Sequence, residues 1–213
     1  MVTALADGTA RLWDAAEGGQ LFDLSGHGAE VNSAHFSADG QWVVTASSDH
    51  TARIWDTATG KQIRTLAGQE GHQIWVLDAQ FSPDGQRVVT ASADGTARVW
   101  DAAAGTVLAV LSHDREVYAA EFSRDGKHVV TASADGRGRV LDADSGEFLT
   151  ILQPHFGEVK DARFSPDGQR VVTASDDGRA RLWRVRSFDS FAELLAAAKQ
   201  LEAEVSASPW GTR

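Results

Sequence analysis

The sequence contains no cysteine and no long apolar run, and each absence excludes a kind of structure or site. Without cysteine the chain can form no disulfide and offers no thiolate as nucleophile or metal ligand, so the redox compartment stays open. No apolar stretch approaches the 18 residues that a membrane-spanning helix needs. No basic and then apolar leader follows Met1. We therefore expect a cytoplasmic protein that does not enter membranes.

Positive charge is also scarce. The chain has 20 lysines and arginines against 30 acidic residues, which gives a formal net charge of −10. Binding to a phosphate backbone needs clustered cations, so nucleic acid is not an expected partner. The remaining histidines His35, His50 and His128 lack the paired spacing of metal ligands. No phosphate-binding loop, nucleophile elbow or H-E-x-x-H motif occurs, so we expect no cofactor and no metal.

One pattern, by contrast, occurs four times. Each copy has a histidine, then F-S-x-D-G, then V-V-T-A-S, then a turn with aspartate, then a segment that ends at or near Trp-Asp. The closing positions are Trp13, Trp55, Trp100, Leu141 and Trp183, spaced 42, 45, 41 and 42 residues apart. A fixed period of this length is the signature of a repeat architecture.

A single repeat reads as four short strands joined by turns. In Ser82-Pro83-Asp84-Gly85, proline presets the backbone, aspartate bonds its own main chain, and glycine accepts a positive φ. The β-branched residues of R-V-V-T-A-S favour a strand. The predicted strands of this repeat cover 76–81, 87–92, 96–100 and 106–111. Four antiparallel strands in about 40 residues make one blade of an all-β propeller, whereas a β-sandwich has no reason to repeat its sequence.

The repeats resemble the WD-repeat (Trp-Asp) family of β-propellers from Met1 to about Val185. The resemblance implies a structural hydrogen-bonded set in each blade, made of a histidine, a serine or threonine, an aspartate and the tryptophan. In one repeat these are His72, Thr90 or Ser92, Asp94 and Trp100. The other sets are His27, Thr45 or Ser47, Asp49 and Trp55; His155, Thr173 or Ser175, Asp177 and Trp183; and His113 with Asp135, where Leu141 replaces tryptophan and the histidine–aspartate pair is expected to remain. The same residue types could suggest a Ser-His-Asp triad, but an enzyme does not need four copies.

The pattern predicts about eighteen strands, in three complete blades and two partial ones, an arrangement that could leave the ring open. Residues 1–186 would form the blades and 187–213 a tail with a short helix. The tail begins with a capping box at Ser190, and its apolar residues recur at helical spacing. That helix could cap the last blade or dock a partner. Asp142 to Glu147 hints at a calcium loop, but other repeats have a plain turn there.

The repeats are unusually alike, since residues 81–100 and 164–183 agree at 17 of 20 positions. This uniformity resembles propellers common in bacteria, in which the propeller is often the C-terminal sensor region of a multidomain signalling regulator. The resemblance implies the C-terminal part of a longer propeller, acting as a protein-binding scaffold without catalytic activity. Two alternatives remain: a structural fragment that self-associates through its incomplete blades, and an enzyme with an undetected site.

In the family, partners commonly dock on the face formed by the loops that enter the first strand. The variable positions there form a predicted protein-binding surface: Glu30, Trp75, Glu116 and Glu158 before the strand, and Asn32, Leu77, Tyr118 and Lys160 within it. Exposed aromatics are favoured anchors, and the three glutamates favour a basic protein or peptide. Alternatively, Trp75 packs on a neighbouring blade.

Overall fold

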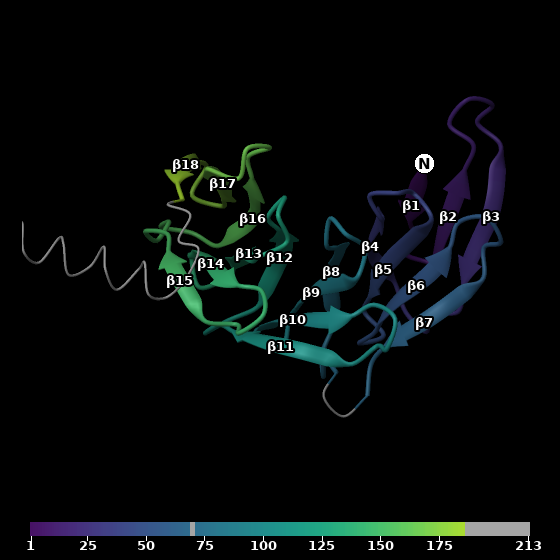
Figure 1. The fold of residues 1–213 in the computed structure, drawn as a ribbon, viewed down its shortest axis with the longest axis horizontal. Helices are drawn as coiled ribbons and strands as arrows, with labels where there is room; N and C mark the ends of the chain where they lie inside the picture. The colour runs from purple at the N-terminus through teal and green to yellow at the C-terminus, as the bar shows by residue number, and fades with distance from the viewer. Residues whose placement is uncertain (69–70, 186–213) are drawn as a thin grey trace, which may run out of the picture.

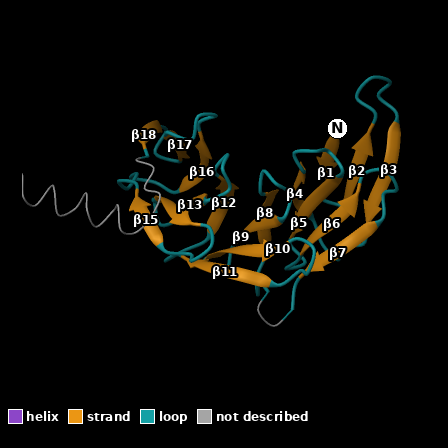
Figure 2. Ribbon diagram, in the orientation of Figure 1, coloured by secondary structure: helices purple, strands orange, loops and turns teal. Residues whose placement is uncertain are grey.

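The computed structural model describes residues 1–68 and 71–185, and all regular structure in this part is β (Figures 1 and 2). The predicted C-terminal helix lies outside the described residues. In the described part of the chain eighteen strands form five antiparallel sheets, as the repeat pattern predicted. Within the described part there is no helix that could cross a membrane.

The five sheets follow one another along the chain, and each uses strands in sequence order. The first sheet contains β1 (Val2–Ala4), β2 (Thr9–Trp13) and β3 (Gln20–Ser25). The second contains β4 (Val31–Phe36), β5 (Trp42–Ser47), β6 (Ala52–Asp56) and β7 (Gln62–Leu66). The third contains β8 (Val76–Phe81), β9 (Arg87–Ser92), β10 (Thr96–Asp101) and β11 (Val107–Ser112). The fourth contains β12 (Val117–Phe122), β13 (His128–Ser133), β14 (Gly138–Asp142) and β15 (Phe148–Ile151), and the last contains β16 (Val159–Phe164), β17 (Arg170–Ser175) and β18 (Ala180–Arg184).

The turn chemistry explains the hairpins. Ser82 Oγ donates to Asp84 Oδ1 at 2.6 Å, and the amide of Gly85 donates to the carbonyl of Ser82 at 2.9 Å. Gly85 has a φ of 71°, a left-handed conformation that glycine adopts without strain. The same F-S-x-D-G turn joins the first two strands of every four-stranded sheet, which is why the register repeats from sheet to sheet.

The core lies between sheets rather than inside one. One cluster joins Val89 and Val99 of the third sheet to Phe122, Val129 and Leu141 of the fourth. The innermost strands β4, β8, β12 and β16 pack side by side in succession. Each blade is therefore buried by its neighbours, as in other repeat proteins.

The sheets form an open arc with β1–β3 at one end and β16–β18 at the other (Figure 1). Within residues 1–68 and 71–185, three sheets have four strands and the two end sheets have three, which agrees with the expected three complete and two partial blades. The arc brings the loops before β4, β8, β12 and β16 to one face of the molecule.

Candidate protein-binding face

A set of buried hydrogen bonds stabilises the third sheet. It lies behind the face that the loops before the innermost strands form. His72 Nδ1 lies 2.8 Å from Asp94 Oδ2, and His72 Nε2 lies 2.6 Å from Thr90 Oγ1. The indole N–H of Trp100 donates to the same Thr90 oxygen at 2.8 Å. Thr90 rather than Ser92 is thus the hydroxyl of the set, because Ser92 Oγ donates to the carbonyl of Trp75 at 2.9 Å. A carboxylate only accepts, so the network assigns the imidazole proton to Nδ1.

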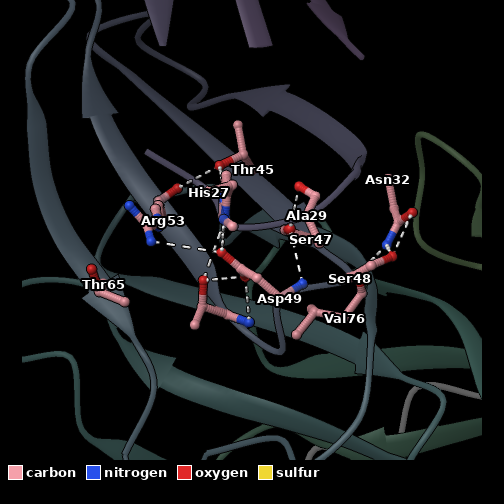
Figure 3. Close-up of polar contacts among 12 residues, drawn as sticks. His27, Ala29, Asn32, Thr45, Ser47, Ser48, Asp49, Arg53, Thr65 and Val76 are labelled. Carbon is pink, nitrogen blue, oxygen red and sulfur yellow. Dashed lines mark hydrogen bonds and ion pairs between the residues drawn. The ribbon is translucent and has the colours of Figure 1, made fainter. Parts of the chain in front are cut away.

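The second sheet has the same arrangement, and Figure 3 shows His27, Thr45 and Asp49 of this set. His27 lies between Asp49 at 2.8 Å and Thr45 at 2.7 Å, and Trp55 donates to Thr45 at 2.9 Å. In both sheets an arginine four residues after the aspartate pairs with it, and Arg53 lies 3.6 Å from Asp49. The last sheet repeats the set with the following residues: His155, Thr173, Asp177 and Trp183.

Burial shapes the protonation of these sets. It lowers the pKa of His27 and His72, because a charged imidazole would lose its hydration. Burial also opposes ionisation of Asp49, but hydrogen bonds from Thr51, the Gly28 amide and His27 outweigh it and lower the pKa of Asp49 to about 2. The pair is therefore a neutral imidazole against an ionised carboxylate, which is a stable structural arrangement.

The fourth sheet differs, and the expected His113–Asp135 pair is wrong. His113 Nδ1 lies 3.0 Å from the carbonyl oxygen of Leu111, and His113 Nε2 lies 2.7 Å from Thr131 Oγ1. Arg139 takes Asp135 instead, with a 2.5 Å contact. In the other sheets with this set the equivalent arginine shares the aspartate with the histidine, whereas in the fourth sheet, where Leu141 replaces the tryptophan, the arginine contacts the aspartate without the histidine. Burial and the nearby guanidinium lower the pKa of His113 to about 4.

The eight predicted docking positions lie at one end of the innermost strands. The carbonyls of the four residues before these strands each accept a hydrogen bond from the turn after the second strand. The carbonyl–amide pairs are Glu30 with Ser48, Trp75 with Ala93, Glu116 with Ala134, and Glu158 with Asp176. The four residues within the strands sit where the pairing register shifts: Asn32, Leu77, Tyr118 and Lys160. The structure thus brings all eight to equivalent places on one face.

On one half of this face, the side chains already form ion pairs and hydrogen bonds with one another. The hydroxyl of Tyr118 donates to Glu158 Oε2 at 2.6 Å, and Lys160 Nζ donates to the same oxygen at 2.6 Å. The ammonium group also lies 3.9 Å from the centroid of the Tyr118 ring. Arg115 lies 3.4 Å from Glu158 and 3.6 Å from Glu116. The hydrogen bond to Glu158 raises the pKa of Tyr118. Two of the three glutamates are therefore already balanced by cations of the chain.

The other half is apolar and accessible. The side chain of Trp75 remains 54% exposed, and Ile74 beside it is 43% exposed. Asn32 is half-buried and is occupied by a hydrogen bond to the carbonyl of Val76 at 2.7 Å. Glu30 is exposed and has no ion pair within residues 1–68 and 71–185. Trp75 is therefore the large apolar side chain that is most accessible to a partner on this half of the face.

Sequence reasoning missed Ile74 and Phe156. Phe156 is 92% exposed, in the loop that enters β16. Both lie between the histidine of the repeat and the innermost strand, where other copies have Gly28 and Ala29 or Asp114 and Arg115. A comparison of these two loop positions across the repeats would have identified them, because large apolar side chains are unusual there.

The described part holds no cluster of three histidine, aspartate or glutamate side chains that could bind a metal ion. In the turn that resembled a calcium loop, Asp142 Oδ1 accepts hydrogen bonds from the amides of Asp144 at 3.1 Å and Ser145 at 2.8 Å. That carboxylate oxygen therefore closes the turn.

A protein-family model described as "WD domain, G-beta repeat" matches four consecutive stretches: residues 18–56, 60–101, 105–142 and 146–184. Each match contains the outermost strand of one sheet and the first three strands of the next. No curated protein matches the chain.

Proposed function

We propose that this chain, which belongs to the WD40 repeat family, is a scaffold that binds a protein or peptide through the face around Trp75. WD40 repeats generally act as protein-interaction scaffolds. The observation that carries the proposal is the exposed Trp75, with the exposed Ile74 beside it, directly before the innermost strand β8. Tryptophan contributes disproportionately to binding energy when a partner encloses it.

The histidine–aspartate sets support a scaffold more than an enzyme. In the sets of His27, His72 and His155, each ring nitrogen contacts an aspartate or a threonine of the same blade. A general base needs a nitrogen within reach of substrate. We therefore assign these side chains to blade stability and propose no catalytic activity.

The partner should offer an apolar pocket rather than a strongly basic surface. Glu116 and Glu158 are balanced by Arg115 and Lys160, so Glu30 is the acidic group left to attract a cation. A partner with one basic residue beside an apolar cleft would fit this face. The excess of acid in the whole chain disfavours nucleic acid.

A binding experiment tests the proposal. Partners that co-purify with the chain are identified by mass spectrometry, and their affinity is measured by calorimetry. Trp75→Ala should weaken binding by about 2 kcal/mol or more, because it removes the apolar anchor. Leu108→Ala is the matched control, since Leu108 is similarly exposed but lies on the outer strand β11. Equal affinity of the Trp75→Ala, Tyr118→Ala double variant and the parent would place the binding site elsewhere.

At a finer level we place the chain in a bacterial, cytoplasmic signalling regulator, as the C-terminal part of a longer propeller. The near identity of residues 81–100 and 164–183 supports this assignment. The coding DNA upstream of Met1 tests it, because further blades and a signalling domain should be encoded there.

The alternative of a self-associating structural fragment is favoured by the uncovered end sheets of the arc, and a native mass measurement distinguishes the two.

A further inference from the structure

A cavity of about 480 Å³ opens where the innermost strands end, at the opposite end of β8 from Trp75. The strands β4, β8, β12 and β16 each end in the phenylalanine of F-S-x-D-G. The apolar wall of the cavity includes these rings and two prolines of the turns that follow: Phe36, Phe81, Phe122, Phe164, Pro83 and Pro166. The repeated sequence therefore builds one largely aromatic wall from four neighbouring sheets.

The innermost strands carry a polar side chain directly before each phenylalanine. In chain order these residues are His35, Gln80, Glu121 and Arg163. Gln80 and Glu121 line the cavity. His35 Nε2 lies 3.3 Å from Asp78 Oδ1, and Arg163 Nε lies 3.0 Å from Asp161 Oδ1. Two of the four side chains thus already have carboxylate partners on the innermost strands.

Glu121 has no ion pair in the part of the chain that the structure describes. Its Oε2 accepts a hydrogen bond from the backbone amide of Phe164 at 2.9 Å. Burial raises the pKa of Glu121, and the carboxylates of Asp161 and Asp78 add to this effect, against the opposing influence of the Phe164 amide and Arg163. A half-buried carboxylate without a counter-ion is stabilised by a ligand that brings a cation to it.

A cation of the chain, Arg124, also lines the cavity. Its Nη1 donates to the carbonyl of Pro166 at 3.4 Å, and the guanidinium forms no ion pair with Glu121. Arg124 is exposed, whereas Glu121 is half-buried. Water and salt screen an exposed charge more strongly than a half-buried one, so the carboxylate dominates the charge at the aromatic wall.

We propose that this cavity binds a small organic cation, with its ammonium group at Glu121 and its apolar body against the phenylalanine rings. The face of an aromatic ring attracts a cation, and the attraction grows where water is excluded. The amide oxygen of Gln80 can accept a further hydrogen bond from the ammonium group. The site lies at the opposite end of the innermost strands from the face around Trp75, and it does not depend on the function proposed for that face.

The probes are three small molecules with the same apolar body and different charge: 2-phenylethylamine, the neutral 2-phenylethanol and the anion phenylacetate. Binding to the full, isotope-labelled chain is measured by NMR titration, and the backbone amide of Phe164 is the reporter because it donates to Glu121. The amine should bind at least about tenfold more tightly than the alcohol. Phenylacetate should bind more weakly than either.

Glu121→Gln keeps an oxygen for the Phe164 amide but removes the charge, so it should weaken binding of the amine at least about tenfold. Glu17→Gln is the matched control, because it removes the same charge from the exposed turn between β2 and β3 and should leave binding unchanged. Arg124→Gln should strengthen binding of the amine, since it removes a like charge from the cavity wall.

The proposal is overturned if Glu121→Gln binds the amine like the parent. It is also overturned if the amine does not shift the Phe164 amide, or if phenylacetate binds the parent as tightly as the amine, which would make Arg124 the ion partner. Thermal melts check that each variant is folded. If Glu121→Gln does not fold, the comparison of the three probes on the parent chain decides.

Discussion

At the scale of single residues, the threonine hydroxyl is the centre of each structural set. Thr90 lies within hydrogen-bond distance of both the imidazole of His72 and the indole of Trp100. All three are buried, so loss of any one leaves polar atoms without partners. The set therefore couples the loop before the first strand to the second and third strands, and holds the docking face in place.

Trp100→Ala should lower the free energy of unfolding by about 3–5 kcal/mol, because it deletes a fully buried aromatic side chain and leaves Thr90 without its indole donor. Urea denaturation followed by circular dichroism measures the change. Trp75→Ala serves as the control and should alter stability little. If the Trp100→Ala variant unfolds at the same urea concentration as the parent, Trp100 does not contribute the core stability expected of it.

Acid should unfold the protein in two stages. The pKa of His113 is lowered from its ordinary value of 6.5 to about 4, and burial also lowers those of His27 and His72. The unfolded chain then binds more protons below pH 6.5, so stability should fall from there to about pH 4. Between about pH 4 and 2 the ionised Asp49, whose pKa is lowered to about 2, should lose its contribution. Thermal melts at each pH test this, and an unchanged melting temperature between pH 7 and 5 would contradict it.

At the scale of the blade, the fourth sheet shows how one substitution rearranges a repeated network. Leu141 has no N–H to donate to Thr131, and the aspartate of that sheet pairs with Arg139. Arg139 is 5% exposed, and Asp135 is the nearest carboxylate that compensates its buried charge. The blade keeps the backbone of its neighbours but is held by an ion pair in place of a histidine–aspartate contact.

Asp135→Asn should therefore destabilise the chain by about 3 kcal/mol, because it leaves a buried guanidinium without its nearest counter-ion. Adding Arg139→Met should recover part of the loss, since an apolar side chain needs no partner. Chemical denaturation of the single and double variants provides the comparison. A double variant less stable than Asp135→Asn would mean that Arg139 is not the dependent charge.

At the scale of the whole molecule, stability is a sum of contacts between neighbouring sheets. Among the described residues, the central sheets are covered on both faces, whereas β1–β3 and β16–β18 each have a single neighbouring sheet in the arc (Figure 1). In repeat proteins each unit contacts only its neighbours, so the end units open more readily.

Amide hydrogen exchange should show this gradient directly. Strands β9 and β10 of the third sheet should be the most protected, and β1 and β18 at the ends the least. Mass spectrometry of peptic fragments resolves these segments. Uniform protection along residues 1–185 would indicate that the end sheets are covered in solution, and would argue against free edges.

The sequence alone determined the number of strands, their order and their grouping into blades, because turn residues and β-branched runs act locally and repeat at a fixed period. The resemblance to the family correctly grouped the histidine, aspartate and tryptophan of three sets, but not His113 with Asp135. Tertiary structure decided which hydroxyl completes each set, and it chose Thr90 over Ser92. Likewise it decided that Arg139 replaces His113 at Asp135, and that Tyr118 and Glu158 satisfy each other while Trp75 stays exposed. These outcomes depend on distances between side chains far apart in sequence, which local patterns do not encode.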